Sequence, residues 1–111
     1  MEVQYYITAD NRNPVREWID GLRDPSTRAR IDARITRLRV GNLSGSKSVG
    51  DGVHEFLIDF GPGYRIYFAP VGEELIWLLC AGSKKRQQAD IDRAKQFCAD
   101  FKVRMTRSKQ K

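Results

Sequence analysis

The sequence has few of the features that mark specialised protein classes. It has two cysteines and one histidine, too few for a disulfide-rich scaffold or a typical transition-metal site. No apolar run approaches the roughly 18 to 20 residues that a helix needs to cross a bilayer, and the polar start does not resemble a signal peptide. Phosphate-binding glycine loops, nucleophile elbows and metalloprotease motifs are missing. We therefore expect a cytoplasmic protein with reduced cysteines, and no metal, cofactor or membrane contact.

The composition is that of a globular protein with a basic balance. The chain has 111 residues, of which 41% are hydrophobic and 31% charged, which suits one domain with its own core. Its 20 Lys and Arg exceed its 14 Asp and Glu, for a formal charge of +6. Such an excess favours nucleic acid, ribosome or an acidic protein as partner. We expect a single domain over residues 1–101, followed by a basic, flexible tail over residues 102–111.

The hydrophobic periodicity predicts an α+β fold, with an N-terminal strand and a helical hairpin followed by an antiparallel sheet and a C-terminal helix. Pro14 and Pro25 each suit a first helical position, and Asp24 suits an N-cap. The Ser- and Gly-rich residues 43–52 are expected to form a surface loop. The predicted strands cover residues 3–8, 53–60, 64–69 and 75–81, and the last helix carries Ile91, Ala94, Cys98 and Phe101.

The segment Gly61-Pro62-Gly63 predicts a tight hairpin between two of these strands. A loop of only these residues would place Asp59 opposite Arg65 and Leu57 opposite Tyr67. An Asp59–Arg65 ion pair is then expected on the face away from the main core. A guanidinium held on a strand also has the geometry to bind a phosphate, including one under attack in RNA cleavage.

Other polar residues have both structural and functional interpretations. Arg30, Arg34 and Arg37 share one stripe of the second helix. This stripe is either a solvated helix face or a surface that binds the phosphates along a nucleic acid. His54 is either a structural residue or an acid–base group. Tyr67 packs across strands or stacks on a base, and Asp90 serves either as a helix N-terminal carboxylate or as a general base.

Two motifs in order make the chain recognisable. The first is Gly61-Pro62-Gly63-Tyr64-Arg65, and the second places Gly82, Lys84, Gln87, Asp90 and Ile91 in the pattern Gly-x-Lys-x-x-Gln-x-x-Asp-Ile. With the arginine-rich second helix before them, they cover roughly residues 3 to 101. The combination resembles the RelE/ParE toxin superfamily, and more narrowly the HigB-type addiction module killer proteins of bacterial type II toxin–antitoxin systems.

The resemblance implies a RelE-like fold and a function. Members of the superfamily are held inactive by a cognate antitoxin, which in the HigB branch usually carries a helix-turn-helix domain. Many members enter the ribosomal A site and cleave mRNA without a metal or small-molecule cofactor, and the ParE-like members inhibit DNA gyrase instead. The chain is accordingly expected to be a ribosome-dependent mRNA endonuclease that inhibits translation. A gyrase inhibitor and an inactive remnant that only binds an antitoxin are the alternatives.

The resemblance also assigns site residues. Arg65 matches the arginine that binds phosphate and stabilises the transition state. Lys84 matches a basic position after the final strand, which the family uses for leaving-group protonation or phosphate binding. Asp90 lies near an acidic or aromatic position of the family, and His54 is a further catalytic candidate. The candidate RNA-binding residues are Arg86, Lys85, Lys47, Arg34, Arg37 and Tyr67.

The chain departs from the family pattern on the strand before the Gly-Tyr-Arg turn. RelE itself has two lysines there, whereas this chain has Glu55 and Leu57. HigB-like relatives often keep an arginine at the Leu57 position. Replacing that cation by leucine removes a charged hydrogen bond to phosphate of about 1.5 to 3 kcal/mol. Lys47 or His54 is the candidate to replace it.

Overall fold

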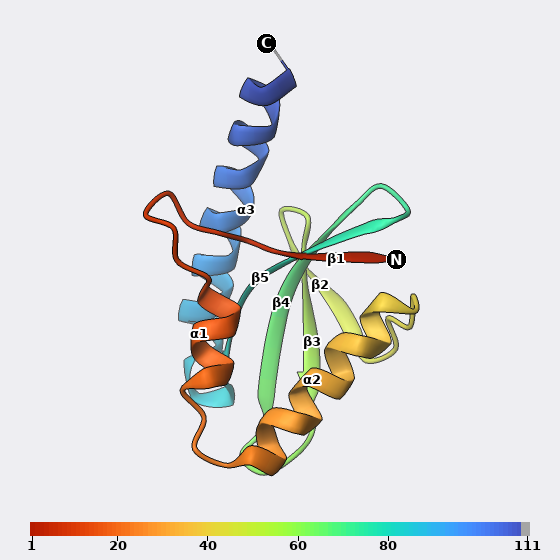
Figure 1. Cartoon of the computed structure of the whole chain (residues 1–111), viewed down its shortest axis with the longest axis vertical. Coiled ribbons are helices and arrows are strands. Elements are labelled where there is room, and N and C mark those ends of the chain that lie inside the picture. The colour runs from red at the N-terminus through yellow and green to blue at the C-terminus, as the bar shows by residue number, and fades with distance from the viewer. Residues whose placement is uncertain (110–111) are drawn as a thin grey trace.

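A computed structural model describes residues 1–109 and contains one mixed five-stranded sheet with helices on both faces (Figure 1). The strand order is β1-β5-β4-β3-β2, and only the β1–β5 pair is parallel. In chain order the elements are β1 (Glu2–Tyr5), α1 (Pro14–Asp20), α2 (Pro25–Arg39), β2 (Ser46–Gly50), β3 (Val53–Ile58), β4 (Tyr64–Val71), β5 (Leu75–Ser83), the 3₁₀ turn η1 (Lys84–Arg86) and α3 (Gln87–Lys109). The predicted α+β class and element order are confirmed.

The two helices of the N-terminal hairpin begin at the expected residues. Pro14 and Pro25 lie in the first turns, where a missing backbone N–H costs nothing. The side chain of Asn13 accepts a hydrogen bond from the N–H of Arg16, and that of Asp24 accepts one from the N–H of Ser26. These caps satisfy backbone donors that the helices leave unpaired.

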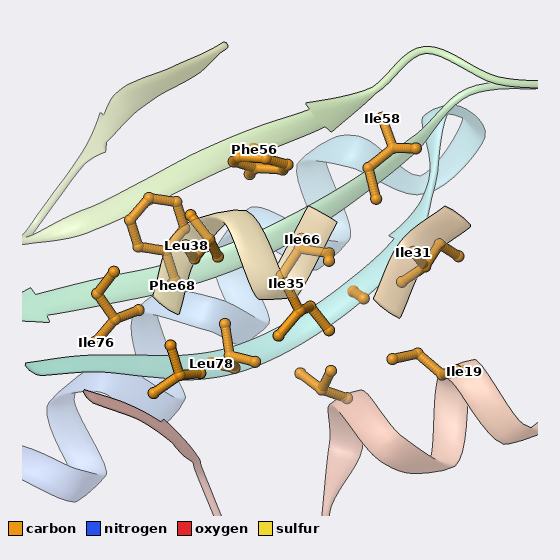
Figure 2. Close-up of a cluster of buried hydrophobic side chains, with 13 residues drawn as sticks. Ile19, Ile31, Ile35, Leu38, Phe56, Ile58, Ile66, Phe68, Ile76 and Leu78 are labelled. Atoms are coloured by element: carbon orange, nitrogen blue, oxygen red, sulfur yellow. The ribbon is translucent and has the colours of Figure 1, made fainter. Parts of the chain in front are cut away.

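One hydrophobic core lies between the helical hairpin and the sheet (Figure 2). Because side chains alternate across a strand, the even-numbered residues of β3 and the start of β4 face α1 and α2. Figure 2 shows α2 directing Ile31, Ile35 and Leu38 toward the sheet. The buried sheet residues in this core include Phe56, Ile58, Ile66, Phe68, Ile76 and Leu78.

A second core lies between the opposite face of the sheet and α3. Ala94, Cys98 and Phe101 of α3 are buried against the sheet, as their helical spacing predicts. Leu79 and Cys80 both belong to this core, because the β4–β5 register shifts between Tyr67 and Phe68. Such a bulge turns two consecutive side chains toward one face.

The cysteines agree with a further expectation. Cys80 and Cys98 are both buried and free of disulfides. Burial raises the pKa of the Cys80 thiol to about 12, so it stays protonated at neutral pH. Across residues 1–109, the structure contains no helix long and apolar enough to span a bilayer.

The predicted register of the β3–β4 hairpin is wrong. The turn spans residues 59–63, two residues more than the expected loop, and pairs Leu57 with Arg65 and Glu55 with Tyr67. The longer turn forms because Phe60 leaves the strand, while the N–H of Gly63 donates to its carbonyl at 3.1 Å. The shift preserves which residues share a face, but the expected Asp59–Arg65 ion pair does not form among the described residues.

Two predictions on the N-terminal half are also wrong. Residues 43–52 are not all loop, because Ser46–Gly50 forms strand β2 at the sheet edge. The strand expected over residues 3–8 covers only Glu2–Tyr5. Beyond it, the N–H of Tyr6 still donates to the carbonyl of Leu78, after which the chain leaves the sheet.

The last helix is longer than the periodicity predicts. The structure continues α3 to Lys109, so residues 102–109, expected as a tail, are helical. Met105 packs against the second core, and Arg104 pairs with Asp100 one turn earlier, which extends the helix beyond Phe101. Residues 110–111 of the expected tail lie outside the described residues.

Two leucines of the sheet, Leu57 on β3 and Leu78 on β5, test where the core lies. Leu78 is fully buried, and Leu57 is 41% exposed. Leu78→Ala should lower the free energy of unfolding by about 2 to 5 kcal/mol, because it leaves a cavity. Leu57→Ala should lower it by roughly 1 kcal/mol or less, since 41% of the surface of Leu57 is already in water. Urea denaturation checks both, and equal losses would contradict this packing.

Candidate functional site

The candidate site is organised around the buried carboxylate of Glu55 on β3, which is only 3% exposed. On one oxygen, Arg65 Nε lies 3.2 Å from Oε1 and Lys47 Nζ lies 3.8 Å from it. On the other, Oε2 accepts hydrogen bonds from the Tyr67 hydroxyl at 3.2 Å and from Gln87 Nε2 at 2.9 Å. A buried charge is tolerated only when it is paired and hydrogen-bonded, and Glu55 meets both conditions. This carboxylate therefore joins β2, β3, β4 and α3.

Arg65 projects from β4 on the α3 face and is only 11% exposed. Its Nε and Nη1 are buried and have no hydrogen-bond partner of suitable geometry among the described residues. The Glu55 carboxylate balances the charge, while part of the guanidinium's donor capacity is unused. A guanidinium with free donors in a low-dielectric site interacts strongly with an oxyanion that reaches it.

Asp90 of α3 occupies the space above Gly82 of β5. A Cβ atom on Gly82 would lie 1.9 Å from Oδ2 of Asp90, so no other residue fits there without displacing the helix. Gly82 is the register partner of Arg65 on the adjacent strand. Asp90 is 2% exposed, and burial raises the pKa of its carboxyl above the ordinary value, opposed by the charge of Arg93 at 3.5 Å.

Lys84 lies at the same end of the sheet as Arg65. Its backbone N–H donates to the carbonyl of Gly63 at 3.2 Å, which ties η1 to the start of β4. Lys84, Lys85 and Arg86 are all exposed. The site therefore has a buried part, made by Glu55 and Arg65, and an exposed basic rim on η1.

Of the predicted site residues, some come together and others do not. Arg65, Lys84, Asp90 and Lys47 all lie around the α3 face of the sheet or its end, and Arg86 is close enough to Asp90 to lower its pKa by its charge. His54 projects to the other face, where its ring stacks on Phe68 with centroids 5.5 Å apart. It therefore does not join Arg65, because the sheet separates the two side chains.

Tyr67 cannot act as predicted, whereas Arg34 and Arg37 keep their expected place on the second helix. Tyr67 is fully buried, so the prediction that it stacks on a base is wrong. Burial, and then the nearby charge of Glu55, raise the pKa of its hydroxyl, which donates to that carboxylate. Arg34 and Arg37 lie on α2 and line a separate cleft on the hairpin side of the molecule.

Sequence reasoning missed the central role of Glu55 and the contribution of Gln87. The sequence did contain a signal for the role of Glu55, because a glutamate inside the mostly apolar segment 53–60 requires a buried partner. Arg65 and Tyr67 lie on the same face of the hairpin as Glu55, so alternation along the strands allows both to contact it. The wrong hairpin register paired Arg65 with Asp59 instead. Gln87 reaches the carboxylate from the start of α3, a long-range contact that no local pattern contains.

The described residues provide no evident metal centre. Within residues 1–109, no three His, Cys, Asp or Glu side chains gather where they could hold a metal ion. The site itself presents guanidinium, ammonium, carboxyl and amide groups of the chain.

Comparison with known proteins adds one relative. An uncharacterized protein of Haemophilus influenzae (strain ATCC 51907 / DSM 11121 / KW20 / Rd) is 45% identical over 78 residues, which cover 70% of this chain and 79% of that protein. The chain belongs to the same family as this Haemophilus protein. No family model matches the sequence, and no solved structure matches it.

Removing the central carboxylate should destabilise the protein strongly. Glu55→Ala leaves the buried Arg65 charge without its partner, which should cost about 3 to 5 kcal/mol in the free energy of unfolding. Glu73→Ala, in the exposed β4–β5 turn, removes the same charge and should change it by about 0.5 kcal/mol or less. Urea denaturation measures both. A Glu55→Ala loss as small as that of the control would show that the ion pair does not organise the site.

The buried Asp90 carboxyl should make stability depend on pH. Because the pKa of the Asp90 carboxyl is raised in the folded protein, the folded state binds the carboxyl proton more tightly than the unfolded state does. The stability that this proton contributes is fully present below the unfolded pKa of about 3.9. That stability is lost as pH rises through the folded-state pKa. In urea denaturation, Asp90→Asn should therefore gain stability relative to wild type from about pH 4 upward.

The exposed Asp92→Asn is the control for this pH series, because it removes a carboxyl from the same helix at the surface. Its stability difference from wild type should stay nearly constant across the same range. A wild type that gains stability over Asp90→Asn as pH rises would contradict the burial of this carboxyl.

Proposed function

We propose that the chain is a HigB-like toxin of the RelE/ParE superfamily that cleaves mRNA on the ribosome without a metal ion. The observation that carries the proposal is that Arg65 and Lys84 lie at the same end of the sheet, beside the turn at Gly63. These are the two positions that the sequence resemblance assigns to phosphate binding and to the leaving group. The RelE-like identity of the fold is part of this proposal.

In the proposed reaction the RNA 2′-hydroxyl attacks the adjacent phosphate, and the 5′-oxygen leaves. Arg65 stabilises the charge that develops on the phosphate, and Glu55 positions the guanidinium through the buried ion pair. Lys84, exposed on η1, donates a proton to the leaving oxygen or binds the phosphate. Asp90, whose carboxyl contacts the register partner of Arg65, is the candidate proton acceptor for the hydroxyl.

The proposed partners follow from charge and from the resemblance. A formal charge of +6 and the exposed bases of η1 favour the polyanionic surface of a ribosome with bound mRNA. A cognate helix-turn-helix antitoxin would cover the toxin until it is removed. The protein would act in the cytoplasm, where its ribosomal target lies.

One observation favours a second candidate function, inhibition of DNA gyrase without cleavage. Leu57, the register partner of Arg65, is 41% exposed at a position where HigB-like relatives often carry a cation. The site therefore has an apolar contact surface beside a guanidinium already neutralised by Glu55. A gyrase inhibitor predicts loss of supercoiling with intact message. An inactive remnant predicts neither effect, and no growth arrest on induction.

An in vitro translation reaction tests the leading proposal. Wild-type protein should stop synthesis and cut ribosome-bound mRNA, while Lys84→Gln should cut about 10²-fold or more slowly, because it lacks the ammonium group. Arg65→Lys keeps the charge but loses the fork geometry, and should be about 10² to 10³-fold slower. Lys102→Gln, an exposed substitution on α3, is the matched control. Intact message with wild type, or equal cutting by all four proteins, would refute the nuclease.

A further inference from the structure

A second basic site lies on the hairpin side of the molecule, away from Glu55. A cleft of about 200 Å³ opens between α2 and the end of β3. Arg30, Arg34 and Arg37 line it from α2, one and two turns apart, so all three side chains project toward the same space. Its other lining residues are Ala33, Ile58, Asp59 and Phe60.

The positive charge of this cleft is not balanced by ion pairs. Among the described residues, none of the three lining arginines forms a salt bridge with a carboxylate. Asp32, the acidic residue within α2, is bound instead by Arg16 of α1 at 2.9 Å. Burial, and then the charge of Arg37, lower the pKa of the Arg34 guanidinium. Like charges held this close attract a multivalent anion.

Two of the guanidinium groups lie over aromatic rings. The Arg30 guanidinium lies 4.0 Å from the centre of the Phe60 ring, and that of Arg34 lies 4.4 Å from the centre of the Phe56 ring. The attraction between a cation and a ring face favours these positions of the two guanidinium groups. Arg34 Nη2 donates to the carbonyl of Leu57 at 3.2 Å, and its buried Nε has no partner among the described residues.

We propose that this arginine cleft, made by Arg30, Arg34 and Arg37, binds the phosphodiester backbone of single-stranded RNA. A guanidinium group can donate two parallel N–H bonds to phosphate oxygens, so it matches phosphate in geometry as well as charge. The cleft is small and open at the surface, which suits a strand that passes along it. The choice of RNA over other phosphate polymers rests on the proposed function.

The cleft and the candidate site flank the same turn. Asp59 and Phe60, which line the cleft, begin the turn over residues 59–63, and Gly63 at its end is bonded to Lys84. A strand that crosses this turn would thus meet the arginine cleft on one side and η1 on the other. The cleft would hold RNA that flanks the cleaved phosphate, and its loss would weaken binding without removing the chemical groups.

Fluorescence anisotropy with a labelled short oligouridylate tests this site directly. The probe is titrated with Arg30→Gln/Arg37→Gln, which removes two exposed lining charges and leaves the buried contacts of Arg34 in place. Its affinity should fall about tenfold or more at low salt. The slope of log affinity against log salt should flatten by about 1.4, because each single-strand phosphate contact contributes roughly 0.7.

A matched control variant and a variant that should bind more tightly make the test more specific. Arg23→Gln/Arg39→Gln removes the same charge from exposed positions outside the cleft lining and should leave the slope unchanged. Asp59→Asn removes the carboxylate that lines the cleft and should tighten binding about twofold to fivefold. Equal losses in both double variants would overturn the cleft as a discrete site, and so would tighter binding of duplex DNA than of the oligouridylate by wild type.

The binding and cleavage experiments can refute the cleft proposal and the nuclease proposal independently of each other. If wild type leaves message intact but the cleft variant loses oligouridylate affinity and salt slope, the cleft stands and the nuclease proposal falls. If wild type cuts message and the cleft variant binds the probe as wild type does, the cleft proposal falls alone. Matching thermal unfolding curves for the exposed-residue variants would show that neither result reflects misfolding.

Discussion

The buried ion pair between Glu55 and Arg65 is the constraint on which the site depends. It places a carboxylate and a guanidinium between a sheet and a helix, where an unpaired charge would be costly. The remaining contacts of Glu55 come from Tyr67 on β4, Gln87 on α3 and Lys47 on β2, so they connect the pair to two further elements. Any movement of α3 or β2 would therefore change the environment of the Arg65 guanidinium.

The backbone around this pair creates the room that the polar groups need. Gly82 has no side chain, so the Asp90 carboxyl can approach the sheet beside the backbone of Arg65. The turn after β3 then separates two groups of cations, those of η1 and those of α2. Cations from both sides of the sheet therefore lie near this one turn, although the hydrophobic cores on the two faces are separate.

Local chemistry made much of the fold predictable, and long-range geometry made the rest unpredictable. Asp24 and Pro25 mark a helix start by their own side chains, and strand alternation assigns Phe56 and Ile66 to one face. The hairpin register depends on whether Phe60 remains in the strand, which local turn preferences do not decide. That error concealed the Glu55–Arg65 pair. Likewise, the extra helical turns after Phe101 depend on packing against the second core and on the Arg104–Asp100 pair.

The most direct measurement follows the Arg65 side chain itself. Nuclear magnetic resonance of the arginine Nε–Hε groups, assigned through Arg65→Lys, reports burial by slow exchange with water. During titration with an oligouridylate, we predict a protected Arg65 signal that shifts as RNA binds to the wild-type protein. A signal that exchanges rapidly before RNA is added, or stays unchanged when wild type is saturated, would contradict a clamped guanidinium that contacts RNA phosphate.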